Sequence, residues 1–173
     1  MKEPRVKRIT GVLFDEYAML GWVMDRLAPI WGLPEIISEP VPFDKTNYYD
    51  DISPNLKRAF LCFPGLVNAV GLADWKRQTI ELEAMSRQPI RAVNIDPGYI
   101  DGARLILAST KDHAHRIYLR DGIFAEVTMR YRFNKWTAFD YTFPDFASGI
   151  YDEFLSMVRK LWLQEHKLDV EKM

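Results

Sequence analysis

The chain has 173 residues, of which 48% are hydrophobic and 27% charged, and its formal net charge is −1. This size and composition suit one domain that buries its own core. The near-neutral charge argues against broad binding to nucleic acid or to an anionic membrane, which needs clustered positive charge. Cys62 is the only cysteine, so no intramolecular disulfide can form, and no apolar run approaches the roughly 20 residues of a membrane span. We expect a single-domain cytoplasmic protein.

Strand-like and helical patterns alternate in the first half of the chain. Val6–Phe14 is a short strand with apolar ends, and Asp15 can cap a helix that runs to about Ala28. The expected elements are, in order, a strand at 6–14, a helix at 15–28, strands at 35–41 and 56–63, a helix at 74–85 and a strand at 90–95. This order is that of the ferredoxin-like motif, although other α+β arrangements share it. The sequence Asp96-Pro97-Gly98 then predicts a type II turn.

The second half begins with a central strand at 103–109, which is almost entirely apolar. Residues 123–133 alternate between apolar and polar, which predicts a strand paired with the run before Asp121-Gly122. A two-residue loop would mix the two faces of this hairpin, so we predict a three-residue loop with a bulge at Gly122. The predicted pairs are Leu119 with Ile123, Ile117 with Ala125, His115 with Val127, Arg116 with Glu126 and Asp112 with Arg130.

An amphipathic helix from Phe146 to His166, capped by Asp145 or Ser148, closes the domain, and a polar tail follows from about residue 167. Together these elements predict an α+β fold. It has a largely antiparallel sheet, with a ferredoxin-like first half, a β-meander and a C-terminal helix.

Polar side chains gather at the ends of the predicted strands. Ser109, Thr110 and Lys111 follow a buried strand, where two hydroxyls and an ammonium could hold a phosphate, although the same residues also make ordinary turns. Asp96 could bind a metal, accept a proton or hydrogen-bond a hydroxyl, or it could simply start its turn. On the hairpin, Arg116 and Glu126 could form the floor of a pocket or lie on a solvated sheet face.

Two further groups are candidates for the same pocket. His115 could act as a base or could merely pack against an apolar face. Lys45, Thr46 and Arg58, with the tyrosines near them, could supply a lid or a second anion contact, or could form a surface loop. The familiar phosphate-loop, nucleophile-elbow, zinc and dinucleotide-binding motifs are absent from the sequence. The lone Cys62 lies in an apolar strand and is expected to be structural.

Several sequence blocks occur in an order that resembles an uncharacterised prokaryotic family of about this length. The blocks are Asn94-Ile95-Asp96-Pro97-Gly98-Tyr99, Leu107-Ala108-Ser109-Thr110-Lys111-Asp112 with His115-Arg116-Ile117-Tyr118-Leu119, Gly122-Ile123 with Ala125-Glu126-Val127-Thr128, and Thr142-Phe143-Pro144-Asp145. The family is a domain of unknown function, and some members carry an automatic GTP-binding label. The resemblance therefore implies no established activity or catalytic residue. It adds weight to a shared pocket, because the blocks contain many of the polar positions selected above.

The leading prediction is binding, with turnover as a further step, of a small phosphorylated or nucleotide-like ligand. The ligand-binding residues would be Lys111, Arg116, Thr110, Ser109, Arg58, Lys45, Thr46 and Asp145. Asp96 and Glu126 would act as acid and base or place a divalent cation, with His115 as the alternative base. Carboxylate ligands would favour Mg²⁺.

The alternative is a non-enzymatic interaction module whose charged sheet face docks a partner protein. That partner could be a second copy of the chain, which would make the protein a homodimer. We do not expect nucleic acid or a membrane as a partner. The sequence leaves the substrate, the reaction, the metal requirement and the oligomeric state open.

Overall fold

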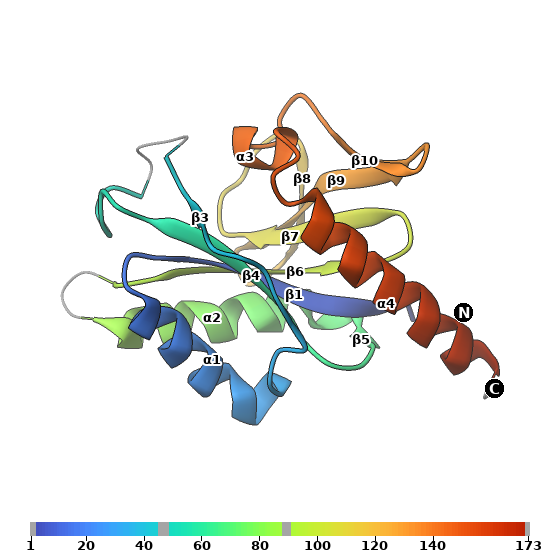
Figure 1. Ribbon diagram of the computed structural model, residues 1–173, viewed down its shortest axis with the longest axis horizontal. Coiled ribbons are helices and arrows are strands. Elements are labelled where there is room, and N and C mark those ends of the chain that lie inside the picture. The colour runs from blue at the N-terminus through green and yellow to red at the C-terminus, as the bar shows by residue number, and fades with distance from the viewer. Residues whose placement is uncertain (1–2, 45–48, 88–90, 172–173) are drawn as a thin grey trace.

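The computed structural model describes residues 3–44, 49–87 and 91–171. Its centre is an antiparallel sheet in the order β10-β9-β7-β6-β1-β4-β2 (Figure 1). The interior strand β1 (Arg5–Phe14) lies between β4 (Lys57–Cys62) and β6 (Asn94–Ile100). The other strands are β2 (Ile36–Ile37), β3 (Val41–Pro42), β5 (Val67–Asn68), β7 (Arg104–Ser109), β8 (Arg116–Arg120), β9 (Ile123–Arg132) and β10 (Lys135–Ala138).

Helices cover both faces of this sheet (Figure 1). The helices are α1 (Tyr17–Trp31), α2 (Leu72–Ser86), α3 (Pro144–Ala147) and α4 (Asp152–Glu171), with a 3-10 turn at Ala69–Gly71. The apolar sides of α1 and α2 share one core with Val6 and Val12 of β1, whereas Ile9 packs with α3 and α4 in a second core. Because β1 is covered on both faces, every residue from Val6 to Phe14 is buried. The predicted α+β fold with a largely antiparallel sheet and a C-terminal helix is confirmed, and its ferredoxin-like description stays a prediction.

The predicted turn at Asp96-Pro97-Gly98 is wrong, because β6 runs straight through these residues. A Cβ atom on Gly98 would lie 2.2 Å from the carbonyl oxygen of Ile106 in β7. Glycine is therefore needed here for the close approach of two strands, and not for a left-handed turn. The pairing of β6 with β7 begins only at Gly98, opposite Leu107, so the two strands part on the N-terminal side of that residue.

The hairpin of β8 and β9 has the predicted pairs Arg116–Glu126 and Ile117–Ala125. The prediction of a three-residue loop is wrong. Asp121 and Gly122 have φ values of 54° and 73° and form a two-residue turn, so that Arg120, in place of Leu119, lies opposite Ile123. The register shift lies one step earlier, between Tyr118 and Arg120, and this bulge keeps the predicted faces.

Two other predicted pairs are also wrong. Arg130 pairs with Arg104 of β7 on one side and with Thr137 of β10 on the other, so Asp112 does not lie opposite it. β8 begins at Arg116, after His115, and the carbonyl of Val127 accepts a hydrogen bond from the Tyr141 hydroxyl instead.

The predicted helix at 146–166 is two helices. Gly149, at a φ of 81°, separates α3 from α4, and α4 then continues through the predicted polar tail to Glu171. The predicted strand at 35–41 is likewise reduced to the two-residue strands β2 and β3, both paired with β4.

Candidate functional site

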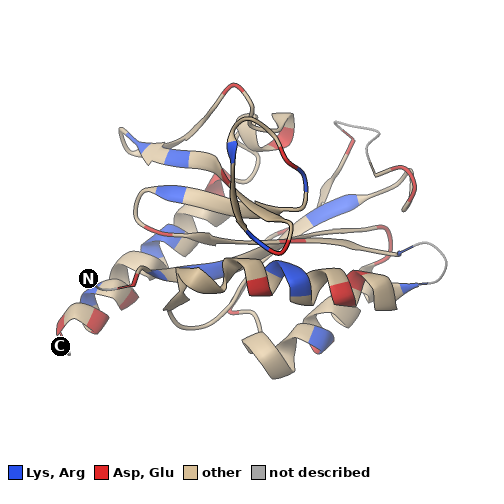
Figure 2. Ribbon diagram, turned by 180° about the vertical axis from the view of Figure 1, so that it is seen from behind, with Lys and Arg blue, Asp and Glu red and all other residues tan. Residues whose placement is uncertain are grey.

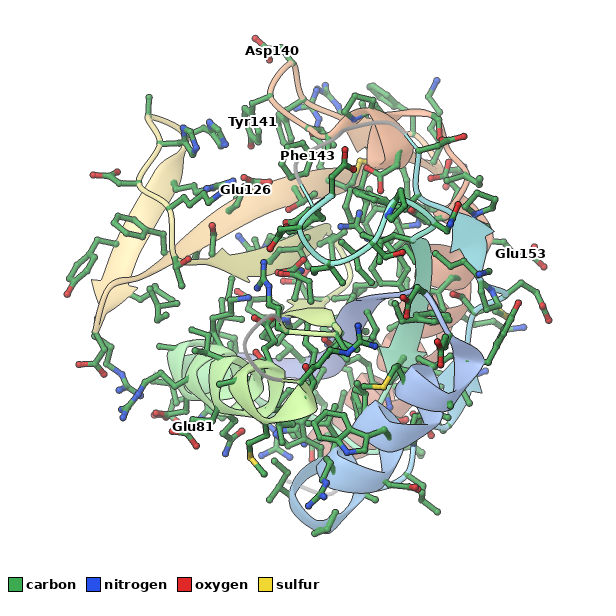
Figure 3. The ribbon with its side chains drawn as sticks, turned by 90° about the vertical axis from the view of Figure 1, so that its left-hand side faces the viewer. Glu81, Glu126, Asp140, Tyr141, Phe143 and Glu153 are labelled. Carbon is green, nitrogen blue, oxygen red and sulfur yellow. The ribbon has the colours of Figure 1, made fainter. Side chains whose placement is uncertain are left out.

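A cavity of about 700 Å³ lies where β6 and β7 part, next to α2, α3 and the loop after β7. Figure 3 shows this end of the molecule, with Glu126 of β9 and Phe143 before α3 labelled. The residues around the cavity are Tyr49, Arg58, Lys76, Ile80, Glu83, Arg91, Asn94, Asp96, Leu107, Ala108, Ser109, Thr110, Lys111, His113, Arg116, Glu126, Thr128, Phe143 and Phe146. Its size is in the usual range for small-molecule sites.

Side chains of α2 take the place of the missing strand partner on the open edge of β6. The ammonium of Lys76 donates to the carbonyl of Ile95 at 3.0 Å, and Glu83 accepts from the N–H of Ile95 at 2.7 Å. Alternate residues of a strand direct their backbone groups to the same side, so the nitrogen of Pro97 also faces this open side. Because proline has no N–H, it leaves no donor there that needs a partner. The edge is thus satisfied without a neighbouring strand, and the space beside it stays open as the cavity.

Most of the residues predicted from the sequence lie around this one cavity. They are Asp96, Glu126, Lys111, Arg116, Thr110, Ser109 and Arg58. His115 and Asp145 are not in the cavity wall. His115 contacts Glu126 and Asp145 contacts Arg58, and both of these partners line the cavity. Lys45 and Thr46 lie outside the described residues.

Asp96 is held among cations. Its carboxylate accepts from Lys76 at 3.1 Å and from the amide of Asn94 at 2.7 Å, and an Arg58 nitrogen lies 3.9 Å away. Burial opposes its ionisation, but the charges of Lys76 and Arg58, with these hydrogen bonds, outweigh burial and hold the pKa of Asp96 below its ordinary value. Asp96 is therefore suited to accept hydrogen bonds from a ligand, and poorly suited to donate a proton.

Arg58 is fixed from behind by a buried ion pair with Asp145. The same carboxylate accepts a hydrogen bond from the Tyr151 hydroxyl at 2.8 Å. The guanidinium also lies over the rings of Phe43 and Phe146, at 4.6 and 5.4 Å from their centroids. Asp145, predicted as a ligand contact or helix cap, therefore acts here through the cation that it holds.

Glu126 is engaged by three donors. One oxygen lies 2.8 Å from Arg116 Nε and 3.0 Å from His115 Nε2, and the other accepts from the Thr128 hydroxyl at 3.1 Å. The His115 ring is stacked on Tyr141 with centroids 4.0 Å apart. In this geometry Nε2 of His115 is turned to Glu126, so this nitrogen reaches a ligand through that carboxylate.

The loop after β7 brings two cations to one side of the cavity. Arg116 donates to the carbonyl of Lys111 at 3.0 Å, and the N–H of Lys111 donates to the Ser109 hydroxyl at 3.2 Å. Partial burial and then the charge of Arg116 lower the pKa of Lys111. Positive charges held this close would be stabilised by an anion bound between them.

Sequence reasoning missed the contribution of α2. Lys76 and Glu83 are buried on a helix whose charged residues of both signs are visible in Figure 2. Burial raises the pKa of Glu83, against the opposing charges of Lys76 and Arg91, and Arg91 donates to it at 2.6 Å. One signal was present, because Lys76, Thr79 and Glu83 recur at helical spacing on the side that also carries Leu72.

The chain was compared with known families, curated proteins and solved structures. The model of the family described as "Domain of unknown function (DUF4416)" matches residues 4–162. The chain belongs to this family. The resemblance seen in the sequence to a domain of unknown function is thus confirmed. No curated protein and no solved structure matches the chain.

Within residues 3–44, 49–87 and 91–171, three or more His, Cys, Asp or Glu side chains are nowhere grouped as a metal site would require. In the same part of the chain, no helix has the length and apolar character to cross a membrane.

Proposed function

We propose that the protein binds a small phosphorylated or nucleotide-like ligand in the cavity between β6 and β7. The observation that carries the proposal is the charge of the wall. Of the described residues that surround the cavity, five are Lys or Arg and three are Asp or Glu. Two of these cations, Lys111 and Arg116, adjoin the hydroxyls of Ser109 and Thr110, so the anionic group would bind at this end.

The remainder of the cavity suits the rest of such a ligand. Ile80, Leu107, Ala108, Phe143 and Phe146 give it apolar walls, against which a ring could pack. The ionised carboxylate of Asp96 could accept hydrogen bonds from ligand hydroxyl or amino groups. Arg58 and Lys76 neutralise that carboxylate, so its presence does not repel an anion.

Turnover of the ligand is the second part of the proposal. Asp96 is held ionised and Glu126 is linked to His115, so proton transfer would use the His115–Glu126 pair, with Asp96 as an acceptor. A divalent cation such as Mg²⁺ would enter with the ligand's phosphates, because Asp96 and Glu126 already have cationic partners.

The alternative of an interaction module needs its charged face at the surface. The Arg116 and Glu126 side chains are each only 9% exposed and lie in the cavity wall. The observations therefore favour the ligand-binding hypothesis, and a homodimer stays a prediction.

The test is thermal unfolding with inorganic phosphate, sugar phosphates and nucleoside monophosphates, each with and without Mg²⁺. A ligand present at about 100 times its Kd should stabilise the protein by about 2.7 kcal/mol, which is roughly 5–10 °C in Tm. Lys111→Met should abolish most of this shift while leaving the Tm without ligand within about 2 °C, because Lys111 is exposed. Lys135→Met, an exposed change on β10 away from the cavity, is the matched control. The absence of any shift with all these anions would refute the proposal.

A further inference from the structure

Arg8 of β1 lies in an aromatic cage on the face of the sheet covered by α1 and α2. Its guanidinium carbon is 4.5 Å from the ring centroid of Trp31, 5.2 Å from that of Trp75 and 5.9 Å from that of Phe63. These residues come from the end of α1, from α2 and from the segment after β4. The Arg8 side chain is nearly buried, since the residue is 9% exposed. None of the four residues lines the cavity between β6 and β7.

The cage gives Arg8 no acceptor. Its Nε is buried without a hydrogen-bond partner, and within the described residues its guanidinium makes no ion pair or hydrogen bond. The other buried cations differ, because Lys7, Arg58 and Lys76 each pair with a carboxylate. Burial lowers the pKa of Arg8 to about 10, so it remains charged at neutral pH. Contact with aromatic faces stabilises this charge in part but leaves the Nε–H unsatisfied.

Exposed apolar side chains lie near two of the cage residues in the chain. Leu33, two residues after Trp31, is 70% exposed. Val70, which is 73% exposed, precedes Gly71, and a Cβ on Gly71 would lie 2.6 Å from Trp75 Nε1. A guanidinium and two Trp rings with an apolar surround have the composition of a binding hot spot.

We propose that the Arg8 cage docks an Asp or Glu side chain of a partner protein, in a segment with apolar residues on both sides of the acid. Nε is buried, so a carboxylate would pair with the two terminal nitrogens of the planar guanidinium through two parallel hydrogen bonds. A single cation favours a carboxylate, because phosphate groups of partner proteins are recognised by clusters of Arg. The exposed side chains of Leu33 and Val70 near the cage favour an acid inside a chain with apolar neighbours over a terminal carboxylate. This inference is independent of the ligand proposed for the cavity.

The experiment uses the blocked peptide acetyl-Leu-Glu-Leu-amide as the probe and acetyl-Leu-Gln-Leu-amide as its neutral counterpart. Each is titrated into the full-length protein while the indole N–H signals of Trp31 and Trp75 are followed by NMR. The Glu peptide should shift both signals saturably, and the Gln peptide should bind at least about tenfold more weakly. Arg8→Met should remove this difference between the peptides. Arg132→Met is the matched control, because Arg132 lies 4.5 Å over the exposed ring of Phe133 and should not affect binding.

Several results would overturn the proposal. Equal shifts with the two peptides would show apolar contact alone, and no saturable shift would show no site. Arg8→Lys, which keeps the charge but loses the fork, supplies a second variant and should bind the Glu peptide more weakly than the wild type. Sedimentation of the wild type and Arg8→Met at two concentrations tests another occupant. A dimer that forms with rising concentration and is lost in Arg8→Met would replace the foreign partner with a second copy of this chain.

Discussion

Two neighbouring cations of β1 have opposite surroundings on the two faces of the sheet. Lys7 is fully buried, and its ammonium pairs with Glu35 before β2 and with Glu165 of α4. Arg8 is nearly as buried, but in the part of the chain that the structure describes its guanidinium contacts aromatic rings and no carboxylate. The cavity cations resemble Lys7, because Arg58 pairs with Asp145. Burial alone therefore does not distinguish the two environments. Lys7 and Arg58 each link two elements of the fold by pairing with a carboxylate. Arg8 makes no such pair within the described residues.

The largest expected effect is in the cavity, where Arg58→Met removes one member of a buried pair. Asp145 would be left as a buried carboxylate that keeps the Tyr151 hydroxyl but has lost its cation. Loss of one partner from a buried ion pair costs about 3–5 kcal/mol. Urea unfolding should show this loss, whereas Arg132→Met, an exposed control, should change the free energy of unfolding by less than about 0.5 kcal/mol. A loss below about 1 kcal/mol for Arg58→Met would contradict the assignment of a buried pair.

A smaller effect is expected for Lys7→Met. The carboxylates of Glu35 and Glu165 are 33% and 28% exposed, so water can solvate them once the ammonium is gone. We therefore expect a loss of about 1–3 kcal/mol, below that for Arg58→Met. Urea unfolding at neutral pH measures it, and Lys135→Met provides the exposed-lysine control.

The same substitution has a pH signature. Burial opposes the charge of Lys7, but its hydrogen bonds to Glu35 and Glu165 outweigh burial and raise its pKa above 10.5. Lys7 thus contributes stability fully below the unfolded pKa of about 10.4, and the contribution is lost as pH rises through the higher folded value. The wild type should lose stability more steeply than Lys7→Met above about pH 10.4. Parallel alkaline profiles would argue against the ammonium pairing.

The smallest effect is expected for Arg8→Met, and with the opposite sign. Methionine can fill the aromatic cage without burying an unpaired charge. The free energy of unfolding should stay unchanged or rise by up to about 1 kcal/mol. A loss above about 1 kcal/mol in urea unfolding would mean that Arg8 stabilises the fold directly, as Lys7 does, and would remove the contrast between them.

Local patterns in the sequence predicted the elements with long, regular periodicity. The alternation at 123–133 gave the register in which Arg116 faces Glu126, because a slip by one residue would reverse every side chain. The exact turn was not predictable, since a bulge elsewhere in β8 restores the same faces as a bulge at Gly122.

The site was predictable only in its parts. Asp96, Lys111, Arg116 and Glu126 were selected by type and position, and they line one cavity. The opening beside β6 was not predictable, because Pro97-Gly98 has the local signature of a turn. Only the tertiary approach of Ile106 shows why glycine is needed there. Lys76 and Glu83 were missed for a related reason, since their role depends on a strand that packs against the helix only after folding.

The parting of β6 from β7 also bears on aggregation. A strand edge with free backbone groups can recruit a strand of another molecule and start intermolecular growth. At Ile95 that edge lies inside the fold, where Lys76 donates to its carbonyl and Glu83 accepts from its N–H. They thus give the protein a hollow within its sheet that is shielded from neighbouring chains.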